Sequence, residues 1–263
     1  MSQAWQTLAR NYAKFDTPLR PNAETVAAIK TCISLEDPLV VVLGSTACFA
    51  DLARRVWFVD VASEALNLVP ASPGRRTIYK DWLDSADEIA QADMIIGDGS
   101  INAVGSVDSA RQLLRLLAEN LQPGAKFVQR IFTNHELQEQ VFSEKLLQAL
   151  KSERYSEARY LIYGVIADSE GMAQIAGIDN YIDNIENHLP IETALSDTCK
   201  ENYFSWRGVS ASESAKSDTK IFFPRRLQLE AMLKDAGFGT DQISAGSFAL
   251  AQYTPIYTTT VML

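Results

Sequence analysis

The chain has 263 residues, of which 47% are hydrophobic and 22% charged, so it can bury one large core or one core with a smaller appendage. With 24 basic and 33 acidic side chains the formal net charge is −9, and a surface of that sign repels phosphate backbones and anionic membranes. The composition therefore argues against nucleic acid and membrane as partners and leaves small molecules and proteins.

The cysteines and the chain ends carry no metal or targeting signal. Cys32, Cys48 and Cys199 are odd in number and widely spaced, so neither a disulfide framework nor a metal site is expected. Residues 1–10 lack the basic stretch and apolar run of a secretory signal, and the uncharged residues 242–263 are interrupted by polar positions. We expect a soluble, cytoplasmic protein.

The first 37 residues are predicted to form two helices, at 3–14 and 22–33, because the prolines at 18 and 21 prevent a continuous one. Residues 39–43 follow as a β-branched run without alternation that ends at Gly44. Such a run is typical of a central parallel strand buried on both faces.

Strand-like and helical segments then alternate as far as residue 132. The pattern predicts helical stretches at 47–55, after a cap at Ser63, and along the apolar stripe of 110–121, and strands at 56–60, 76–80, 93–98 and 125–132. This alternation predicts an α/β fold with a doubly wound, mostly parallel sheet. Ligands of such sheets bind outside the carboxyl ends of the strands.

The remainder of the chain divides into an irregular part and a regular end. Residues 134–223 are expected to contain helices at 136–150, 157–167 and 178–189 and polar linkers such as 210–220, which we interpret as a helical insertion or cap. From Pro224 a helix runs to Gly237, and two β-like segments, 239–244 and 248–261, predict an antiparallel C-terminal finish.

Two predicted strand ends suggest a nucleotide-like ligand. Gly44 lies where a strand turns toward a helix and lets the backbone approach a ligand, while Ser45 and Thr46 add hydroxyl donors; a plain tight turn explains Gly44 equally well. Asp60 follows 16 residues later at the end of the next strand. That is close to the spacing at which an acid accepts both ribose hydroxyls, although a solvated strand-end carboxylate is the alternative.

The ends of the next two predicted strands add further candidate ligand-binding residues. Asp81 offers an acceptor for an exocyclic amine and Trp82 a ring that can stack on a base, although a tryptophan here can also be core. After the fourth strand, Asp98 lies between two glycines and before Ser100, which favours close approach of a ligand over packing.

In this order the residues resemble the class I S-adenosylmethionine-dependent methyltransferases over most of the chain. The matching segments are 40–44, 59–60, 81–82, 92–100 and 121–125, and residues 233–238 before a hairpin, an ending that separates the chain from nicotinamide-binding folds. The resemblance implies S-adenosyl-L-methionine as cofactor and direct methyl transfer to a small molecule. It implies cofactor contacts from Gly44, Ser45, Thr46, Asp60, Asp81, Trp82, Asp98, Gly99 and Ser100.

The chain departs from the family in its first loop, which usually reads GxGxG after an acidic strand residue. Here residues 44–48 read GSTAC, and Val42 stands where the acid is expected. The PLRP segment at 18–21 is similar to a bacterial branch of the family, and that resemblance implies that Tyr12 and Arg20 fold over the cofactor and meet its carboxylate.

A general base and an acceptor pocket are less well defined. His135 follows the fifth strand and is the candidate base for a hydroxyl acceptor, with an exposed first-turn histidine as the alternative. Aromatic residues in the insertion can line an acceptor pocket or form its core: Tyr155, Tyr160, Tyr163, Tyr181, Tyr203 and Trp206.

We therefore expect an N-terminal helical cap (1–37), a cofactor-binding domain (38–133 and 224–263) and a helical insertion or cap (134–223). A small-molecule methyltransferase is the favoured function. A non-catalytic binding or assembly subunit of the same fold and a nicotinamide-dependent oxidoreductase are the alternatives. The sequence leaves open the acceptor, the atom that is methylated and whether the chain forms a homodimer.

Overall fold

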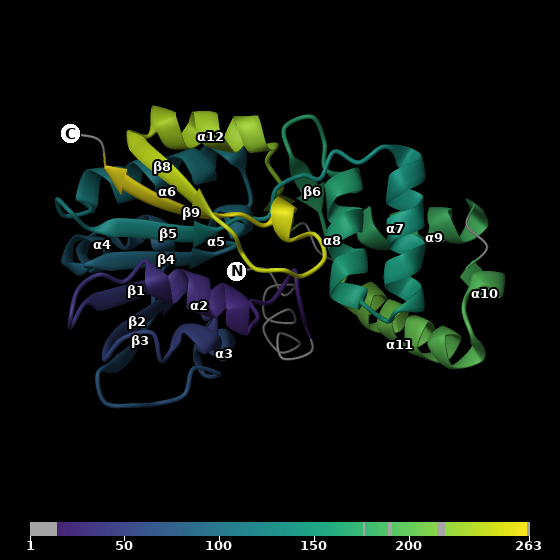
Figure 1. Ribbon diagram of the computed structural model, residues 1–263, viewed down its shortest axis with the longest axis horizontal. Helices are drawn as coiled ribbons and strands as arrows, with labels where there is room; N and C mark the ends of the chain where they lie inside the picture. The colour runs from purple at the N-terminus through teal and green to yellow at the C-terminus, as the bar shows by residue number, and fades with distance from the viewer. Residues whose placement is uncertain (1–14, 176, 189–190, 215–218, 262–263) are drawn as a thin grey trace.

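A twisted sheet of seven strands forms the larger part of the molecule in the computed structural model, which describes residues 15–175, 177–188, 191–214 and 219–261 (Figure 1). The strand order is β3-β2-β1-β4-β5-β9-β8. The strands are β1 (Leu39–Leu43), β2 (Arg55–Asp60), β3 (Arg75–Tyr79), β4 (Met94–Asp98), β5 (Lys126–Arg130), β8 (Phe238–Ile243) and β9 (Ile256–Val261).

The first five strands are parallel, and β9 runs antiparallel to both β5 and β8. β1 lies between β2 and β4, and its five residues are all buried. A strand covered on both faces needs apolar side chains at every position, which is why its sequence shows no alternation. The predicted α/β class, the mostly parallel doubly wound sheet and the antiparallel C-terminal strand are confirmed.

Helices cover both faces of the sheet (Figure 1). Val41 of β1 packs in one core with α4 (Ala86–Gln91), α6 (Val107–Asn120) and α12 (Arg226–Asp235). Val40 and Val42 point the other way and pack with α2 (Ala23–Thr31) and α3 (Ser63–Leu66). The predicted apolar stripe of α6 faces this sheet through Ala110, Leu113, Leu114 and Leu117.

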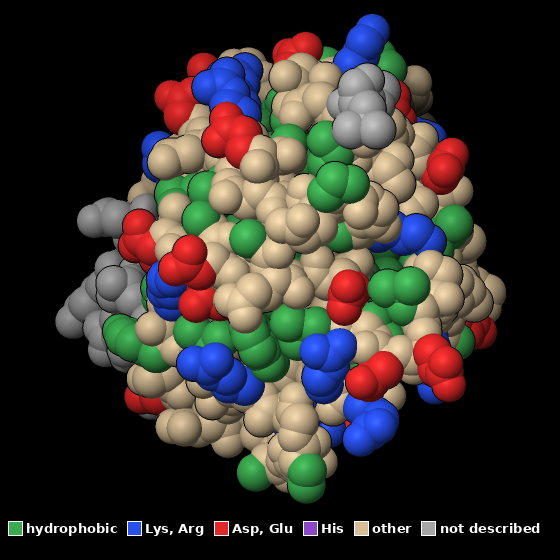
Figure 2. Space-filling view, turned by 90° about the vertical axis from the view of Figure 1, so that its left-hand side faces the viewer, with side chains coloured by type: hydrophobic (Ala, Val, Ile, Leu, Met, Phe, Trp, Pro, Cys, Tyr) green, Lys and Arg blue, Asp and Glu red, His purple; other side chains and the backbone are tan. Residues whose placement is uncertain are grey.

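A helical cap stands beside the carboxyl ends of the parallel strands (Figure 1). It has its own core, in which aromatic and aliphatic side chains of several helices pack together. It comprises α7 (Glu139–Lys151), α8 (Tyr155–Ile166), α9 (Gly177–His188), α10 (Ile191–Ala194), α11 (Asp197–Ser214) and the strand pair β6 (Met172–Gln174) and β7 (Lys220–Phe222). At the opposite end of the molecule, basic and acidic side chains are interspersed (Figure 2).

The structure corrects several local predictions. Residues 47–55 do not form a helix: only a single 3-10 turn, Ala47–Phe49, follows Gly44. Ser63 is the first residue of α3 and not its cap. The predicted linker at 210–220 is helical as far as Ser214, because α11 packs on α7 and α9 although its sequence shows no apolar stripe.

The predicted helix 3–14, which contains Tyr12, lies outside the described residues. Within the described ranges, no helix is long and apolar enough to cross a membrane.

Candidate cofactor and substrate site

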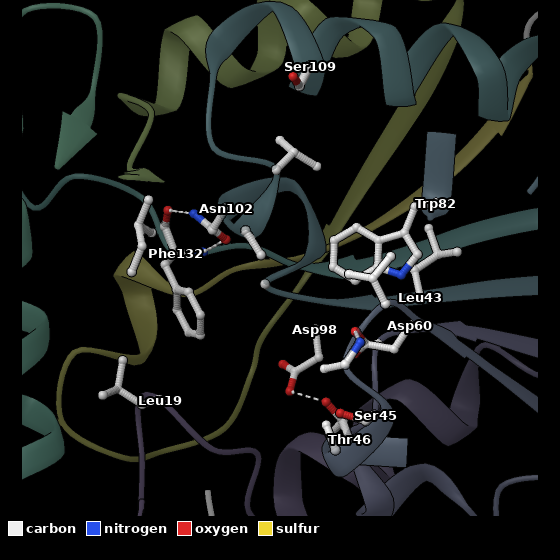
Figure 3. Close-up of a pocket in the computed structure, with 18 of the residues that line it drawn as sticks. Leu19, Leu43, Ser45, Thr46, Asp60, Trp82, Asp98, Asn102, Ser109 and Phe132 are labelled. Carbon is white, nitrogen blue, oxygen red and sulfur yellow. Dashed lines mark hydrogen bonds between the residues drawn. The ribbon is translucent and has the colours of Figure 1, made fainter. Parts of the chain in front are cut away.

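A cavity of about 460 Å³ opens at the carboxyl ends of the parallel strands, between the sheet and the cap (Figure 3). Pockets for small molecules have volumes of roughly 300–1,000 Å³. The loops after β1, β2, β3 and β4 all reach it, as expected for a doubly wound sheet. They contribute Gly44, Ser45, Thr46, Asp60, Asp81, Trp82, Asp98 and Gly99.

Gly44 ends β1 in a backbone conformation with φ of +126°, which residues with a side chain rarely adopt. Its N–H donates to the carbonyl of Val59 at 2.9 Å, so the turn is tied to β2. A Cβ atom here would meet only the Trp82 ring, at 4.0 Å. The backbone at the head of the cavity is thus open to close approach.

Asp60 is the last residue of β2, and its carboxylate lines the cavity close to Ser45 (Figure 3). Its Oδ1 accepts from the Ala62 N–H at 2.8 Å, and the Ser45 hydroxyl also hydrogen-bonds to it. Burial nevertheless raises the pKa of Asp60 above its ordinary value of 3.8. A partly buried carboxyl group with a raised pKa in a cavity wall is typical of functional sites.

The loop after β3 places one carboxylate and one ring beside Asp60. The Trp82 Nε1–H donates to the Val59 carbonyl at 2.7 Å, which fixes the indole over the end of β2. Asp81 is exposed, and its Oδ1 accepts from the Leu83 N–H at 2.9 Å, capping the short 3-10 turn Trp82–Asp84. Asp81 therefore lies at the mouth of the cavity and Trp82 within its wall.

Asp98 is held in a buried ion pair. Its Oδ1 lies 2.6 Å from Nε of Arg130, and both side chains are almost completely buried. Its Oδ2 accepts from the Thr46 hydroxyl at 3.1 Å (Figure 3), while the guanidinium of Arg130 also donates to the carbonyls of Pro18 and Leu19. Asp98 thus lines the cavity and joins the loop after β1 to β5 and to residues 18–19.

Of the two predicted cofactor-binding residues after Asp98, Gly99 lines the cavity and Ser100 does not belong to the described lining. Gly99 lines the cavity with φ of +69°, and a Cβ atom on it would lie only 2.7 Å from the Phe132 ring. Ser100 is buried, does not belong to the described lining, and donates from its hydroxyl to the Leu43 carbonyl at 2.7 Å. Gly99 therefore shapes the cavity, whereas Ser100 ties β4 to β1.

Arg20 lies outside the described lining, although Leu19 beside it belongs to that lining. Its charge acts on the Cys48 thiol, whose pKa burial raises to about 12. Arg20 is thus near the loop after β1, and its contact with the cofactor carboxylate stays a prediction.

His135 is buried rather than exposed, and it does not belong to the described lining. Its Nε2 is 2.8 Å from the Leu161 carbonyl, and its Nδ1 accepts from the Leu137 N–H at 3.1 Å. Burial lowers its pKa, and its ring stacks on Phe142 of the cap. Both nitrogens serve the packing of the cap, so we do not carry the candidate base forward.

The rest of the cavity wall comes from segments that the sequence did not predict to bind a ligand. Tyr163 is the exception, because it is one of the six aromatic residues predicted to line an acceptor pocket or form the core of the insertion. The other five, Tyr155, Tyr160, Tyr181, Tyr203 and Trp206, pack in or against the core of the cap. The wall includes Phe15 and Leu19 from the N-terminal segment, Asn102 and Phe132, and Arg159, Tyr163, Ile221 and Phe223 from the cap.

The described residues contain no group of three or more His, Cys, Asp and Glu side chains that could hold a metal ion.

No family model and no curated protein matches the sequence. Solved structures are similar in fold. They include the CcbJ methyltransferase from Streptomyces caelestis (TM-score 0.59, 11% identity, 100% of this chain and 99% of that chain covered). A SAM-dependent methyltransferase from Methanosarcina mazei has a TM-score of 0.50 at 13% identity, with 89% of this chain and 97% of that chain covered.

A protein from Rhodobacter sphaeroides that is provisionally assigned to the zinc-dependent alcohol dehydrogenases is similar to the same degree (TM-score 0.58, 12% identity, 99% of this chain and 97% of that chain covered). At such identities the likeness establishes the fold, and a fold alone does not fix the reaction. The chain has the class I methyltransferase fold, as the sequence resemblance implied.

Proposed function

We propose that this protein is a methyltransferase that uses S-adenosylmethionine to methylate a small molecule. The observation that supports this most strongly is the convergence of Gly44, Asp60, Asp81 and Asp98 from four successive strand ends on one cavity. The similar methyltransferase folds are a second support.

The residues present suit such a cofactor. Asp60 offers a carboxylate to the two ribose hydroxyls, Asp81 an acceptor for the adenine amine, and Trp82 an aromatic surface beside them. Gly44 has no side chain to block the approach of the ligand, and Ser45 provides a hydroxyl for its methionine end.

The chemistry needs alignment more than acid–base groups. When bound, S-adenosylmethionine supplies a methyl group on a sulfonium, and its transfer leaves S-adenosylhomocysteine. Phe132, Tyr163 and Phe223 form an aromatic wall on the other side of the cavity, which excludes water and positions an acceptor.

One observation favours a second candidate, a non-catalytic binding subunit of the same fold. The loop after β1 keeps only the first glycine of the family pattern, and a single 3-10 turn follows it where a helix is expected. Such a protein would keep the fold without turning over the cofactor.

Isotope transfer distinguishes these functions. The purified protein is incubated with S-adenosylmethionine carrying a deuterated methyl group and a small-molecule extract of its expression host, and the products are analysed by mass spectrometry. A methyltransferase forms S-adenosylhomocysteine and a deuterated product, and Asp60→Ala abolishes both. If the cofactor binds but no methyl group is transferred, the result supports the non-catalytic binding subunit. If neither cofactor binding nor methyl transfer is detected, the result contradicts the proposal.

A further inference from the structure

The two sides of the cavity differ in charge. The strand ends contribute three carboxylates, Asp60, Asp81 and Asp98, to its lining. On the cap side, α8 contributes Arg159, which is the one basic residue among the described residues that line the cavity. An elongated ligand in this cavity therefore meets acidic groups toward the sheet and a cation toward the cap.

Arg159 is buried although it is charged. Only 3% of its surface is exposed, and its guanidinium carbon lies 5.5 Å from the centre of the Phe15 ring, a cation–π contact. The N–H of Asp16 donates to the hydroxyl of Ser156 at 3.0 Å, so the segment that carries Phe15 is docked on α8. Ser156, Arg159 and Tyr163 recur at helical spacing and share one face of that helix.

The two buried arginines differ in where they lie. Arg130 pairs with Asp98 and binds two carbonyls, and it does not belong to the described lining. Arg159 does line the cavity, and the planar fork of an arginine matches the two oxygens of a carboxylate.

Three aromatic side chains of the cavity lining suit an apolar molecular body. Phe132 and Phe223 are stacked with ring centres 6.2 Å apart and planes at 18°, and Tyr163 packs on Phe223 at 5.3 Å. All three line the cavity beside Leu19. A flat, apolar group would bury its surface here without leaving a polar atom unsatisfied.

We propose that the methyl acceptor is a small aromatic carboxylate with a hydroxyl or amine on its ring. Its carboxylate pairs with Arg159 while its ring packs on Phe132, Tyr163 and Phe223. The oxygen or nitrogen on the ring takes the methyl group from the sulfonium, which leaves as S-adenosylhomocysteine, and releases its proton to solvent. This inference rests on the proposed function and adds the chemical class of the acceptor. The carboxylates of Asp60 and Asp81 repel the anionic end of such a molecule and so orient it toward the cap, while the charge of Asp98 is balanced by Arg130.

Matched pairs of acids and amides test the charge requirement. The melting temperature of the protein saturated with S-adenosylhomocysteine is measured with benzoate or benzamide, phenylacetate or phenylacetamide, and 3-phenylpropionate or 3-phenylpropanamide. At least one acid is expected to raise the melting temperature by roughly 2–4 °C more than its amide. Arg159→Gln is expected to remove that difference, while Arg154→Gln, a partly exposed control at the start of the same helix, retains it.

The outcomes separate this inference from the function on which it rests. If S-adenosylhomocysteine itself does not shift the melting temperature, the proposed function fails. If it does, but acids and amides behave alike in the wild type, or the preference survives Arg159→Gln, the acceptor class is wrong. If Arg159→Gln binds S-adenosylhomocysteine more weakly but, once saturated with it, keeps the preference for acids, the guanidinium contacts the cofactor and the inference is contradicted.

Discussion

In the proposed function, Asp60 serves cofactor binding at the expense of stability. Its carboxylate is partly buried without a cationic partner among the groups that shift its pKa, and desolvation raises that pKa above 3.8. Removing the charge relieves this cost, whereas a ribose loses an acceptor with full negative charge. Removing the charge of Asp60 is therefore expected to increase stability and to decrease cofactor affinity.

Asp60→Asn is expected to leave the melting temperature of the ligand-free protein unchanged or higher, because the amide oxygen can still accept from Ala62. Its affinity for S-adenosylhomocysteine is expected to fall by roughly 10- to 100-fold, the loss typical of a hydrogen bond to a charged group. Thermal unfolding and calorimetric titration measure the two quantities. Asp84→Asn, at an exposed position outside the described lining, is the matched control. A variant that is both less stable and equally tight in binding would contradict this role.

The raised pKa of Asp60 also predicts a pH dependence. As the pH falls through that raised value, the folded protein takes up a proton at Asp60 and loses the ionised acceptor, so affinity for S-adenosylhomocysteine decreases. Stability changes in the other direction, because the cost of burying this charge disappears when the group is protonated. Titrations between neutral pH and the onset of acid unfolding should show the decrease in the wild type. The Asp60→Asn variant should lack it, and an equal decrease in both would assign the effect to another group.

The buried ion pair of Asp98 and Arg130, unlike Asp60, is expected to stabilise the folded protein. Removing one partner leaves the other charge buried, which costs about 3–5 kcal/mol. Asp98→Asn should therefore lower the free energy of unfolding in urea by that amount. Asp51→Asn, which removes an almost fully exposed partner of Arg75, should cost about 0–1 kcal/mol. Similar losses in the two variants would mean that the buried pair contributes no more than a surface one.

At the scale of elements, the strand ends show what local sequence can determine. β-branched runs predicted β1, β2 and β4, and each run ends at a residue that lines the cavity. Because parallel strands end on the same edge of a sheet, those ends could be placed together without knowing any side-chain contact.

The other half of the site depends on long-range packing and could not be predicted in this way. The pairing of Asp98 with Arg130 follows from the register of β4 on β5, in which these two residues are direct neighbours. The sequence around Arg159 shows one unusual local feature, a charged residue within an otherwise apolar helical run at 158–164. That feature does not say which surface the arginine faces.

The turn between β4 and α5 (Ser100–Ala103) offers a prediction with an internal control. Gly99 and Gly105 both have positive φ, at +69° and +79°, but only at Gly99 would a Cβ atom meet a ring, that of Phe132. Gly99→Ala and Gly105→Ala thus share the backbone strain, and Gly99→Ala should be more destabilising by about 1–3 kcal/mol, the usual cost of overpacking. Urea unfolding measures the difference. Equal destabilisation would mean that Phe132 yields freely and does not fix the shape of this wall.

At the scale of the whole molecule, the cavity is a product of three parts of the chain. The sheet and the loops at its strand ends contribute the carboxylates and Phe132, the cap contributes Arg159, Tyr163 and Phe223, and residues 15–19 contribute Phe15 and Leu19. Arg130 binds the carbonyls of residues 18–19 and the carboxylate of Asp98 together, so the N-terminal segment is tied to the strand ends. The net charge of −9 is compatible with this arrangement, because a sulfonium cofactor is a cation.

Calorimetric titration of the wild-type protein with S-adenosylhomocysteine, with NADH as the competing candidate, tests the central claim most directly. We predict saturable binding of one S-adenosylhomocysteine per chain and no heat of binding from NADH. Absence of binding at millimolar S-adenosylhomocysteine, or binding of NADH in its place, would contradict the assignment of this cavity to a methyl-donating cofactor.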